Sequence, residues 1–357
     1  MKTYQPAPSA AAMATRYALM NLTASCATCA MLIGKLRLNV SSDRLIVLTI
    51  LFNVIAVAGQ NLVSLFADRV TDKHTGVRLA TMLIVLGVLF PVEFGINFKV
   101  VTAAIGTAVL HAFTTSSLLD RSGFRSEHIG LYAAGGVIGI AFAEYAAFLG
   151  YLALGFFMMF ACPSDKGEGL PSAAENRQAK APSTPFAPLL ILALFIAMMG
   201  GSYLVGSLSF SWDSGFYKYM LLIAFAAAAG RFLGGWLSDR IGTATVLIGG
   251  LVGGTLLLLY AADHQWLALA GLALLSSSAA PVVLLLFRLM PRHPGFAASL
   301  AATAAYLGYT MIKLYPMQPK HFTVFPLVLL AVTLSVSFVL WLLARRKATA
   351  KEVSDNV

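Results

Sequence analysis

Few side chains in this sequence could do chemistry inside an apolar environment. His111, Glu144 and Arg231 each lie within a long apolar segment. An ionisable group in such a segment is costly unless it is paired or wet, so each is a candidate functional residue. His111 and Glu144 are the candidates for proton binding, and His111 is the stronger because its charge can change near neutral pH. The alternative is a neutral His111 that is hydrogen-bonded between helices.

Small polar residues form stripes in two of the apolar segments. Within each segment they recur at positions i, i+4 and i+7, which is one face of a helix. In lipid, such a stripe must face a water-filled cavity or bond to its own helix backbone, and the sequence leaves both alternatives open. The stripes and two polar residues of later segments make up the candidate cavity set: Asn21, Ser25, Thr28, Thr107, His111, Thr114, Tyr203 and Ser277.

Motifs of enzymes and of ATP-driven pumps are absent from the sequence. It contains no G-x-x-x-x-G-K-[ST], no H-E-x-x-H and no G-x-S-x-G. Cys26 and Cys29 form a C-x-x-C within an apolar stretch, where small packing residues are the simpler interpretation than a metal or redox pair. We therefore expect no catalytic residue, no metal and no cofactor.

The composition is that of a membrane protein. Of the 357 residues, 59% are hydrophobic and only 11% are charged, and the mean hydropathy is +0.80. A chain of this kind cannot hide its apolar surface in one water-soluble globule, so a soluble enzyme and a free nucleic-acid-binding protein are excluded. The net charge of +10 suits cytoplasmic loops better than nucleic acid, and lipid is the expected surrounding.

The apolar segments predict an all-α polytopic membrane protein with 12 transmembrane helices. Each segment is long enough to cross a bilayer or nearly so. They fall at about 14–34, 45–66, 78–96, 99–119, 128–146, 147–163, 186–208, 217–238, 243–262, 265–287, 295–315 and 324–344. Almost no polar break separates 128–146 from 147–163, where only Gly150 suggests a turn, so one long kinked helix is an alternative there.

A polar linker divides the chain into two halves. Residues 164–185 are rich in Pro, Ser, Gly and mixed charge, which is typical of a flexible linker. The prediction is a six-helix bundle at 1–163, a cytoplasmic linker at 164–185, a second six-helix bundle at 186–345 and a cytoplasmic tail at 346–357. The Lys and Arg residues gather in segments that are cytoplasmic if both termini are cytoplasmic, which favours that topology.

The two halves carry a matching motif. Asp68-Arg69 follows the second apolar segment and Asp239-Arg240 follows the eighth, 171 residues later. A parallel repeat of six helices is the signature of one transporter architecture. The plainer alternative is that a short charged loop merely fixes topology.

The second copy resembles the G-x-L-x-D-R-x-G loop motif of the major facilitator superfamily. Gly235, Leu237, Asp239, Arg240 and Gly242 match its fixed positions. The first copy keeps the Asp-Arg pair but has serine and threonine where glycines are usual, and the basic pair that normally follows is missing from both copies. The helix count, the linker and the repeat extend the resemblance over nearly the whole chain, and some features are similar to small-solute or drug-efflux members.

The resemblance implies where gating and binding residues lie. Asp68 is expected near the start of the eleventh helix, around Pro294, and Asp239 near the start of the fifth, around His128. A carboxylate is favoured at a helix N-terminus, so these contacts would latch the two bundles on the cytoplasmic side. The expected gating set is Asp68, Arg69, Asp239, Arg240 and Arg231.

Small residues in the fifth, eighth and eleventh segments are open to two interpretations. Glycine and alanine let helices approach closely in lipid. In the resembling family these helices slide at the interface between the halves, whereas static packing is common in any membrane protein.

The prediction is therefore a secondary transporter that moves a small organic solute by alternating access, coupled to a proton or solute gradient. It would be a monomer in a bacterial inner membrane, with both termini cytoplasmic. The alternative is a non-transporting membrane scaffold or sensor that keeps the fold, and a cavity holding His111 and Asn21 would separate the two.

Overall fold

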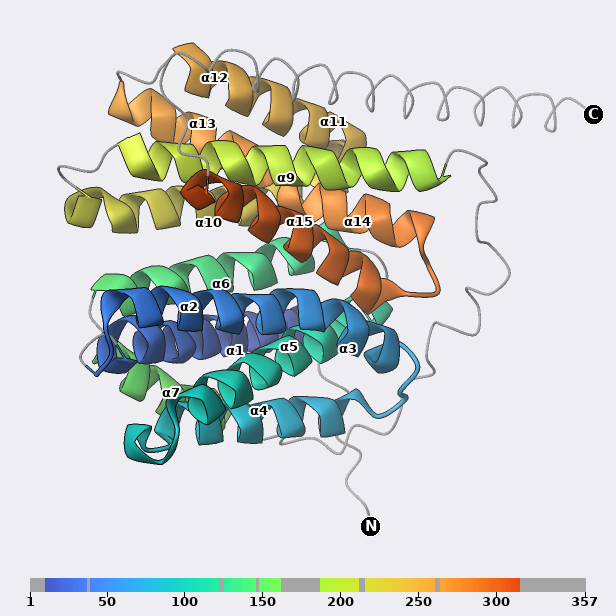
Figure 1. The fold of residues 1–357 in the computed structure, drawn as a ribbon. Coiled ribbons are helices and arrows are strands. Elements are labelled where there is room, and N and C mark those ends of the chain that lie inside the picture. Colours follow the sequence, from blue (N-terminus) through green and yellow to red (C-terminus); the bar gives the residue numbers. More distant parts are fainter. Residues whose placement is uncertain are drawn as a thin grey trace, which may run out of the picture.

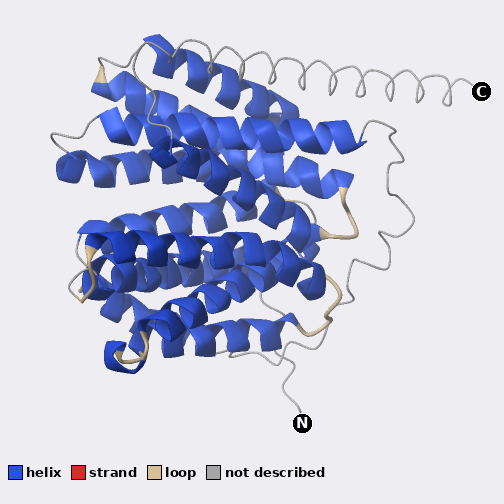
Figure 2. Ribbon diagram, in the orientation of Figure 1, coloured by secondary structure: helices blue, strands red, loops and turns tan. Residues whose placement is uncertain are grey.

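The computed structural model describes residues 10–36, 39–121, 125–145, 148–161, 187–211, 216–260 and 264–314. Within these ranges the regular elements are all helices, as Figure 2 shows. The predicted linker at 164–185, the twelfth segment at 324–344 and the tail at 346–357 lie outside the described residues.

Within the described ranges, the first half of the chain forms seven α-helices. Helices α2 and α3 form one continuous helix, joined by a π-helical turn, η2. The bounds are α1 Ala10–Ala30 with η1 Met31–Leu36, α2 Ser42–Asn53, η2 Val54–Ala58, α3 Gly59–Ala67, α4 Lys73–Leu89, η3 Val92–Phe94, α5 Ile96–Arg121, α6 Ser126–Tyr145 and α7 Leu149–Ala161.

The described part of the second half also consists of long helices. A π-helical turn, η5, again interrupts one of them. The bounds are α9 Ala187–Ser211, α10 Phe216–Ile241, α11 Thr243–Ile248, η5 Gly249–Gly253, α12 Gly254–Tyr260, α13 Gln265–Ser277, α14 Ala279–Leu289 and α15 Pro294–Leu314.

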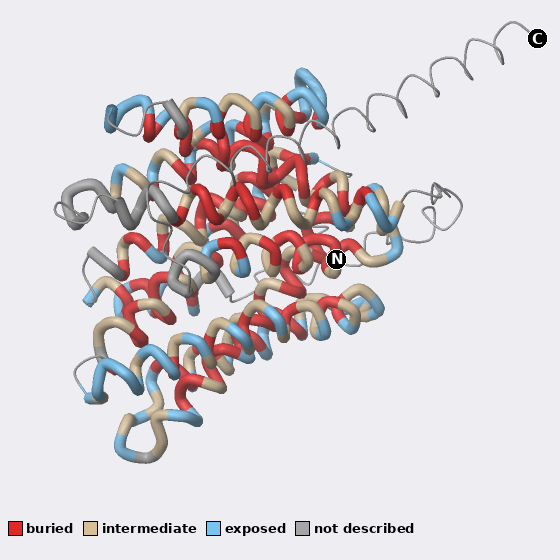
Figure 3. Tube along the Cα trace, turned by 45° about the horizontal axis from the view of Figure 1, so that its top comes forward, coloured by how far each residue is buried: buried red, intermediate tan, exposed pale blue. Residues whose placement is uncertain are grey.

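The helices gather in two groups that follow the chain. Figure 1 shows α1–α7 in the lower half of the view and α9–α14 in the upper half, with α15 crossing between them from its start near α3. Each group has its own core: one apolar cluster runs from Met13 to Phe157, and a second is built almost wholly from residues between Leu194 and Ala301. Figure 3 shows the buried residues along the sides where helices face one another.

Many of the helices suit a lipid environment. Six described spans are long and apolar enough to cross a membrane: Ala10–Gly34, Ser42–Ala67, Ile96–Asp120, Ala187–Gly206, Leu221–Ile241 and Gln265–Leu289. Large apolar side chains point outward from them, such as Leu62 at 74% and Trp266 at 76% exposure. In water such surface would be unfavourable, whereas lipid covers it.

The fifth and sixth apolar segments are separate helices. α6 ends at Tyr145 and α7 begins at Leu149. Ala143 near the end of α6 and Ala153 near the start of α7 share one apolar cluster with Ala30 at the end of α1. The structure therefore has two α-helices, both packed against the end of α1, where one long kinked helix was the alternative. Gly150, which the sequence suggested as a turn, lies within α7. A Cβ atom on Gly150 would collide with the side chain of Ala30.

The small residues mostly serve packing inside each group of helices. A Cβ atom at Gly135 or Gly139 of α6 would collide with the backbone of α1, and one at Gly230 of α10 would collide with the backbone of α13. Between the groups, only a few approaches are this tight, among them Gly235 of α10 against Ser126 of α6. Among the described residues, close packing within each group is therefore the main role of these glycines, and Gly295 of α15, against Asp68 and Ser116, is a further close approach between the groups.

Candidate functional site

Asp68 immediately follows α3 and joins the two groups of helices. Its Oδ1 atom accepts a hydrogen bond from the backbone N–H of Gly295 at 2.8 Å, and its Oδ2 atom accepts one from Phe296 at 3.1 Å. Both amides belong to the first turn of α15, whose free N–H groups and dipole favour a carboxylate. The expected position of Asp68 at the start of the eleventh helix is confirmed.

Further groups from the first half surround this carboxylate. The Ser116 hydroxyl of α5 donates to Oδ1 of Asp68 at 2.7 Å. Lys73 donates to the Ser116 hydroxyl at 2.7 Å and forms an ion pair with Asp120. Burial raises the pKa of Asp68, while the hydrogen bonds from Ser116 and from α15 and the charge of Lys73 lower it. Asp68 thus ends a polar network that is anchored in α5.

Asp239 makes the equivalent contacts in the opposite direction. Its two oxygens accept from the backbone N–H groups of Ser126 and Glu127, each at 2.9 Å. These amides begin α6, so a carboxylate near the end of α10 caps a helix of the first half. This contact, too, lies where the family resemblance implies it, within two residues of His128.

The arginines of the two motifs do not take part in the caps. The Arg240 guanidinium lies 3.4 Å from the centre of the Trp236 ring, one turn back on α10. Arg69 is exposed, and its side chain has no hydrogen bond or ion pair with a residue of the described ranges. Their gating role stays a prediction.

A third contact joins the halves. Asn61 of α3 donates from its side-chain amide to the Thr303 hydroxyl of α15 at 2.8 Å. Thr303 lies two turns beyond the Asp68 cap along α15. The same hydroxyl lies 3.5 Å from the carbonyl of Val57 in η2.

Arg231 reaches from α10 to α6. Its Nη1 atom donates to the carbonyl of Ala133 at 3.1 Å. Its Nε atom is buried, and no residue of the described part of the chain accepts from it. Arg231 therefore adds a fourth contact between the halves, and no carboxylate of the described ranges pairs with it.

His111 and Asn21 belong to one polar cluster that Tyr132 of α6 brings together. Nδ1 of His111 is 2.6 Å from the Tyr132 hydroxyl, and the Thr114 hydroxyl is 2.9 Å from it. The Asn21 amide donates to the Tyr132 carbonyl at 2.9 Å, and the Ser25 hydroxyl donates to the Asn21 carbonyl oxygen at 3.2 Å. The cluster thus joins α1, α5 and α6.

Three further hydroxyls of the cavity set are satisfied within their own helices. The hydroxyls of Thr28, Thr107 and Ser277 donate to carbonyls of their own helices, at 2.9, 2.9 and 2.6 Å. Tyr203 is buried, with 5% of its surface exposed. The side chain of Glu144 lies outside what the structure describes. The hydroxyls accordingly behave as the packing alternative expects.

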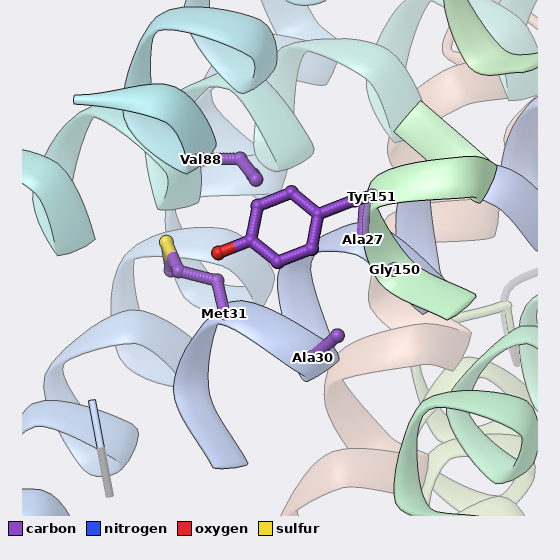
Figure 4. Close-up of a pocket in the computed structure, with 6 residues that line it drawn as sticks. All are labelled: Ala27, Ala30, Met31, Val88, Gly150 and Tyr151. Atoms are coloured by element: carbon purple, nitrogen blue, oxygen red, sulfur yellow. The ribbon is translucent and has the colours of Figure 1, made fainter. Parts of the chain in front are cut away.

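The small cavity drawn in Figure 4 is apolar and lies away from the polar cluster. Its volume is about 10 Å³, and Tyr151 of α7 closes it against α1 and α4. The lining residues are Ala27, Ala30, Met31, Val88, Gly150 and Tyr151. A second, open groove near the end of α4 is also apolar. Neither contains a residue of the candidate cavity set, and the described residues hold no group of three or more metal-ligating side chains.

Sequence reasoning missed Tyr132, Ser116, Asn61 and Thr303. Tyr132 could have been noticed as the bulky polar residue that precedes the small-residue run of the fifth segment. Ser116 belongs to the same apolar segment as His111 but not to its i, i+4, i+7 stripe. Asn61 and Thr303 carry no signal in a single sequence, because the pair joins residues 242 positions apart.

Solved structures of major facilitator transporters have this fold. A structure of the transporter FucP in the outward conformation aligns with a TM-score of 0.63 and 14% identity over 92% of this chain and 98% of that chain. A variant of the E. coli fucose:proton symporter FucP gives a TM-score of 0.62, and a bacterial homologue of the iron transporter ferroportin, in an outward-facing state, gives 0.58, both at 14% identity and the same coverage. No family model and no curated protein matches the sequence. The chain therefore has the all-helical fold of the major facilitator superfamily.

Proposed function

We propose that this chain is a secondary transporter that moves a small organic solute across a membrane by alternating access. The observation that carries the proposal is that an aspartate from each half caps a helix of the other half. Asp68 of the first half binds the start of α15, and Asp239 of the second half binds the start of α6. Contacts of this kind are few and polar, so they can break and form again without disrupting either apolar core.

The caps define one closed side. Asp68 and Asp239 lie at the same end of the two halves, the end that the charge pattern assigns to the cytoplasm. We propose that the described state is closed on that side, as in a carrier that faces outward. Two of the structures with this fold are themselves described as outward.

The full architecture is part of the proposal. It has twelve transmembrane helices in bundles at 1–163 and 186–345, with the linker 164–185 and both termini in the cytoplasm of a bacterial-type cell. The protein works as a monomer among lipids and without nucleic acid. Gating is assigned to Asp68, Asp239 and Arg231, with Arg69 and Arg240 beside them.

The solute site is proposed at the polar cluster around His111 and Asn21. Its groups are an imidazole, an amide and hydroxyls, with no carboxylate or lysine among the contacts. Such a site suits a small neutral or zwitterionic compound better than a highly charged anion. His111 is the leading candidate for coupling to a proton gradient, and Glu144 is the second.

Thermal unfolding of the purified protein across a panel of small solutes tests this proposal. We expect some solutes to raise the unfolding temperature of the wild type, because a ligand that binds only the native state stabilises it. The shift should shrink in His111→Ala and persist in His264→Ala, a matched change at an exposed position before α13. A shift that is equal in all three proteins would show that the site lies elsewhere.

A non-transporting scaffold or sensor is the second candidate. Two observations favour it. Neither cavity described above contains His111 or Asn21, and the Asn21 amide is bonded to α6 and to Ser25, so its polar atoms are satisfied within the protein. Proteoliposomes separate the two candidates. A scaffold would not exchange any solute of the panel across the vesicle membrane, whereas a carrier would exchange those that stabilise it.

A further inference from the structure

The Tyr132 hydroxyl lies in a chain of three short polar contacts. It is 2.6 Å from Nδ1 of His111 and 2.9 Å from the Thr114 hydroxyl. The Thr114 hydroxyl is in turn 2.6 Å from the carbonyl oxygen of Leu110. Each contact joins two electronegative atoms at hydrogen-bond distance, so each requires one proton between its atoms.

Counting the available protons fixes the direction of every bond. The Leu110 carbonyl has no proton, so the Thr114 hydroxyl must donate to it, which is the usual bond of a threonine to its own helix. Thr114 has then used its only proton, and Tyr132 must donate to Thr114. Tyr132 has then used its own, and the proton of the third contact must come from His111.

The opposite order of donors is excluded by the 2.6 Å contact between the Thr114 hydroxyl oxygen and the Leu110 carbonyl oxygen. If Thr114 donated to Tyr132, the Thr114 and Leu110 oxygens would stand 2.6 Å apart with no proton between them, which is repulsive. The other oxygen near the Thr114 hydroxyl is the His111 carbonyl at 3.3 Å, and it also lacks a proton.

We propose that Tyr132 is a positioning residue that holds neutral His111 in the tautomer with its proton on Nδ1. The other ring nitrogen, Nε2, is then a bare acceptor. Within the described ranges Nε2 has no hydrogen-bond partner, and His111 is only half-buried. The bond made by one ring nitrogen decides what the other can do.

This assignment narrows the solute class, and in this respect it rests on the proposed function. A bare imidazole nitrogen accepts hydrogen bonds, so neutral His111 would bind a hydroxyl or an ammonium group of the solute rather than a carbonyl or a carboxylate. A coupling proton would bind at Nε2. It could not arrive through Tyr132, because the chain of bonds ends at the Leu110 carbonyl, which has no proton to give.

Nitrogen NMR of the histidine rings tests the tautomer directly. The full-length protein is labelled with ¹⁵N-histidine and reconstituted in lipid, and the His111 signals are identified by their loss in His111→Gln. We expect neutral His111 to show a protonated Nδ1 and an unprotonated Nε2. The opposite pattern in the wild type would overturn the proposal.

Two variants test whether Tyr132 sets the tautomer. Thr114→Val keeps the side-chain shape but removes the acceptor for the Tyr132 proton, so Tyr132 should donate to Nδ1 and the ring proton should move to Nε2. Tyr132→Phe removes the acceptor for the Nδ1 proton, and the fraction with Nε2 protonated should rise. An unchanged tautomer in both variants would contradict a positioning role.

Thr115→Val is the matched control for Thr114→Val. The Thr115 hydroxyl binds carbonyls of its own helix, at 2.6 and 3.3 Å, and does not contact Tyr132. The His111 signals should therefore match the wild type, and a switch here would mean that packing, not the proton count, sets the tautomer. The NMR result is independent of transport: a protein with Nδ1 protonated that binds no solute would refute only the proposed function.

Discussion

Asp68 and Asp239 make the same pair of backbone contacts in different surroundings. Asp68 is half-buried and also accepts from Ser116, whose hydroxyl is held by Lys73. Asp239 is exposed, and among the described residues it accepts hydrogen bonds from the two amides of α6 alone. The two aspartates occupy matching positions in the sequence repeat, but they differ in burial and in the number of their hydrogen bonds. We therefore expect the Asp68 contact, between α3 and α15, to be the more stable of the two.

Removing the Asp68 carboxylate should have the largest effect. Asp68→Ala leaves the Gly295 and Phe296 amides without their partner, and loss of a cap plus loss of charged hydrogen bonds costs about 2–3 kcal/mol. Hydrogen exchange of the first turn of α15 should therefore accelerate roughly 30- to 140-fold. Mass spectrometry of peptides from this turn measures it in the lipid-reconstituted protein.

The same experiment shows whether the two caps act together. If they form one latch, exchange at the start of α6 should also rise in Asp68→Ala, because the halves part as units. Acceleration confined to α15 would mean that the cap stabilises one helix end and does not control the separation of the halves.

Asp239→Ala should have a smaller effect. Its contacts are exposed, so water replaces them more easily, and we expect a cost of about 1 kcal/mol. Exchange at the start of α6 should rise roughly fivefold. An effect equal to or larger than that of Asp68→Ala would reverse the comparison between the two junctions.

Ser116→Ala should weaken the Asp68 junction. It removes one hydrogen bond to the carboxylate and one from Lys73 but leaves both contacts to α15, at a cost of about 0.5–1 kcal/mol. Exchange at the start of α15 should rise, and if the two caps form one latch, exchange at the start of α6 should rise with it. Ser117→Ala is the control, since Ser117 contacts Tyr17 instead. Similar exchange in both serine variants would show that the network does not support Asp68.

The smallest expected effect is a change of stability with pH that arises from Asp68 and Asp72, in the loop between α3 and α4. Burial raises the pKa of Asp68 above its ordinary value of 3.8. Just above pH 3.8 the folded protein therefore binds more protons at this residue than the unfolded chain, and its contribution to stability falls as the pH rises through that window. Thermal unfolding from pH 4 to 7 should show this slope in the wild type and lose it in Asp68→Asn.

Asp72 should behave in the opposite way. Its hydrogen bonds from Thr75 and from the backbone at the start of α4 lower the pKa. Its contribution is therefore present above pH 3.8 and is lost as the pH falls through the lowered pKa. Asp72→Asn should remove stability at neutral pH but not in strong acid, and equal slopes in the Asp68 and Asp72 variants would contradict both assignments.

The fold and the two aspartate caps could be predicted because they depend on repeated, local patterns. Long apolar segments fix the helices, and a carboxylate that ends one helix must find donors, which the start of another helix supplies. Which helix start each aspartate meets came from the resemblance to the major facilitator superfamily and not from the repeat alone. The twelfth helix and the linker lie outside the described residues and remain predictions.

The polar cluster could be predicted only in part. The spacing of Thr107, His111 and Thr114 identifies a common face, but it does not say whether that face meets water or another helix. In the structure, Nδ1 of His111 meets another helix: the Tyr132 hydroxyl of α6 contacts both His111 and Thr114 of α5. Such a contact depends on how two helices pack, and one sequence carries no direct signal of that.

The distance across the Asp68 junction tests the central claim most directly. Thr71 and Arg292 are exposed on either side of it and can carry spin labels in a chain whose Cys26, Cys29 and Cys162 are replaced by alanine. For a carrier that opens on this side, double electron–electron resonance spectroscopy in lipid should give a short and a long distance between the two labels. The long one should dominate when Asp68→Ala and Asp239→Ala are combined. A single, unchanged distance in both proteins would contradict alternating access through this junction.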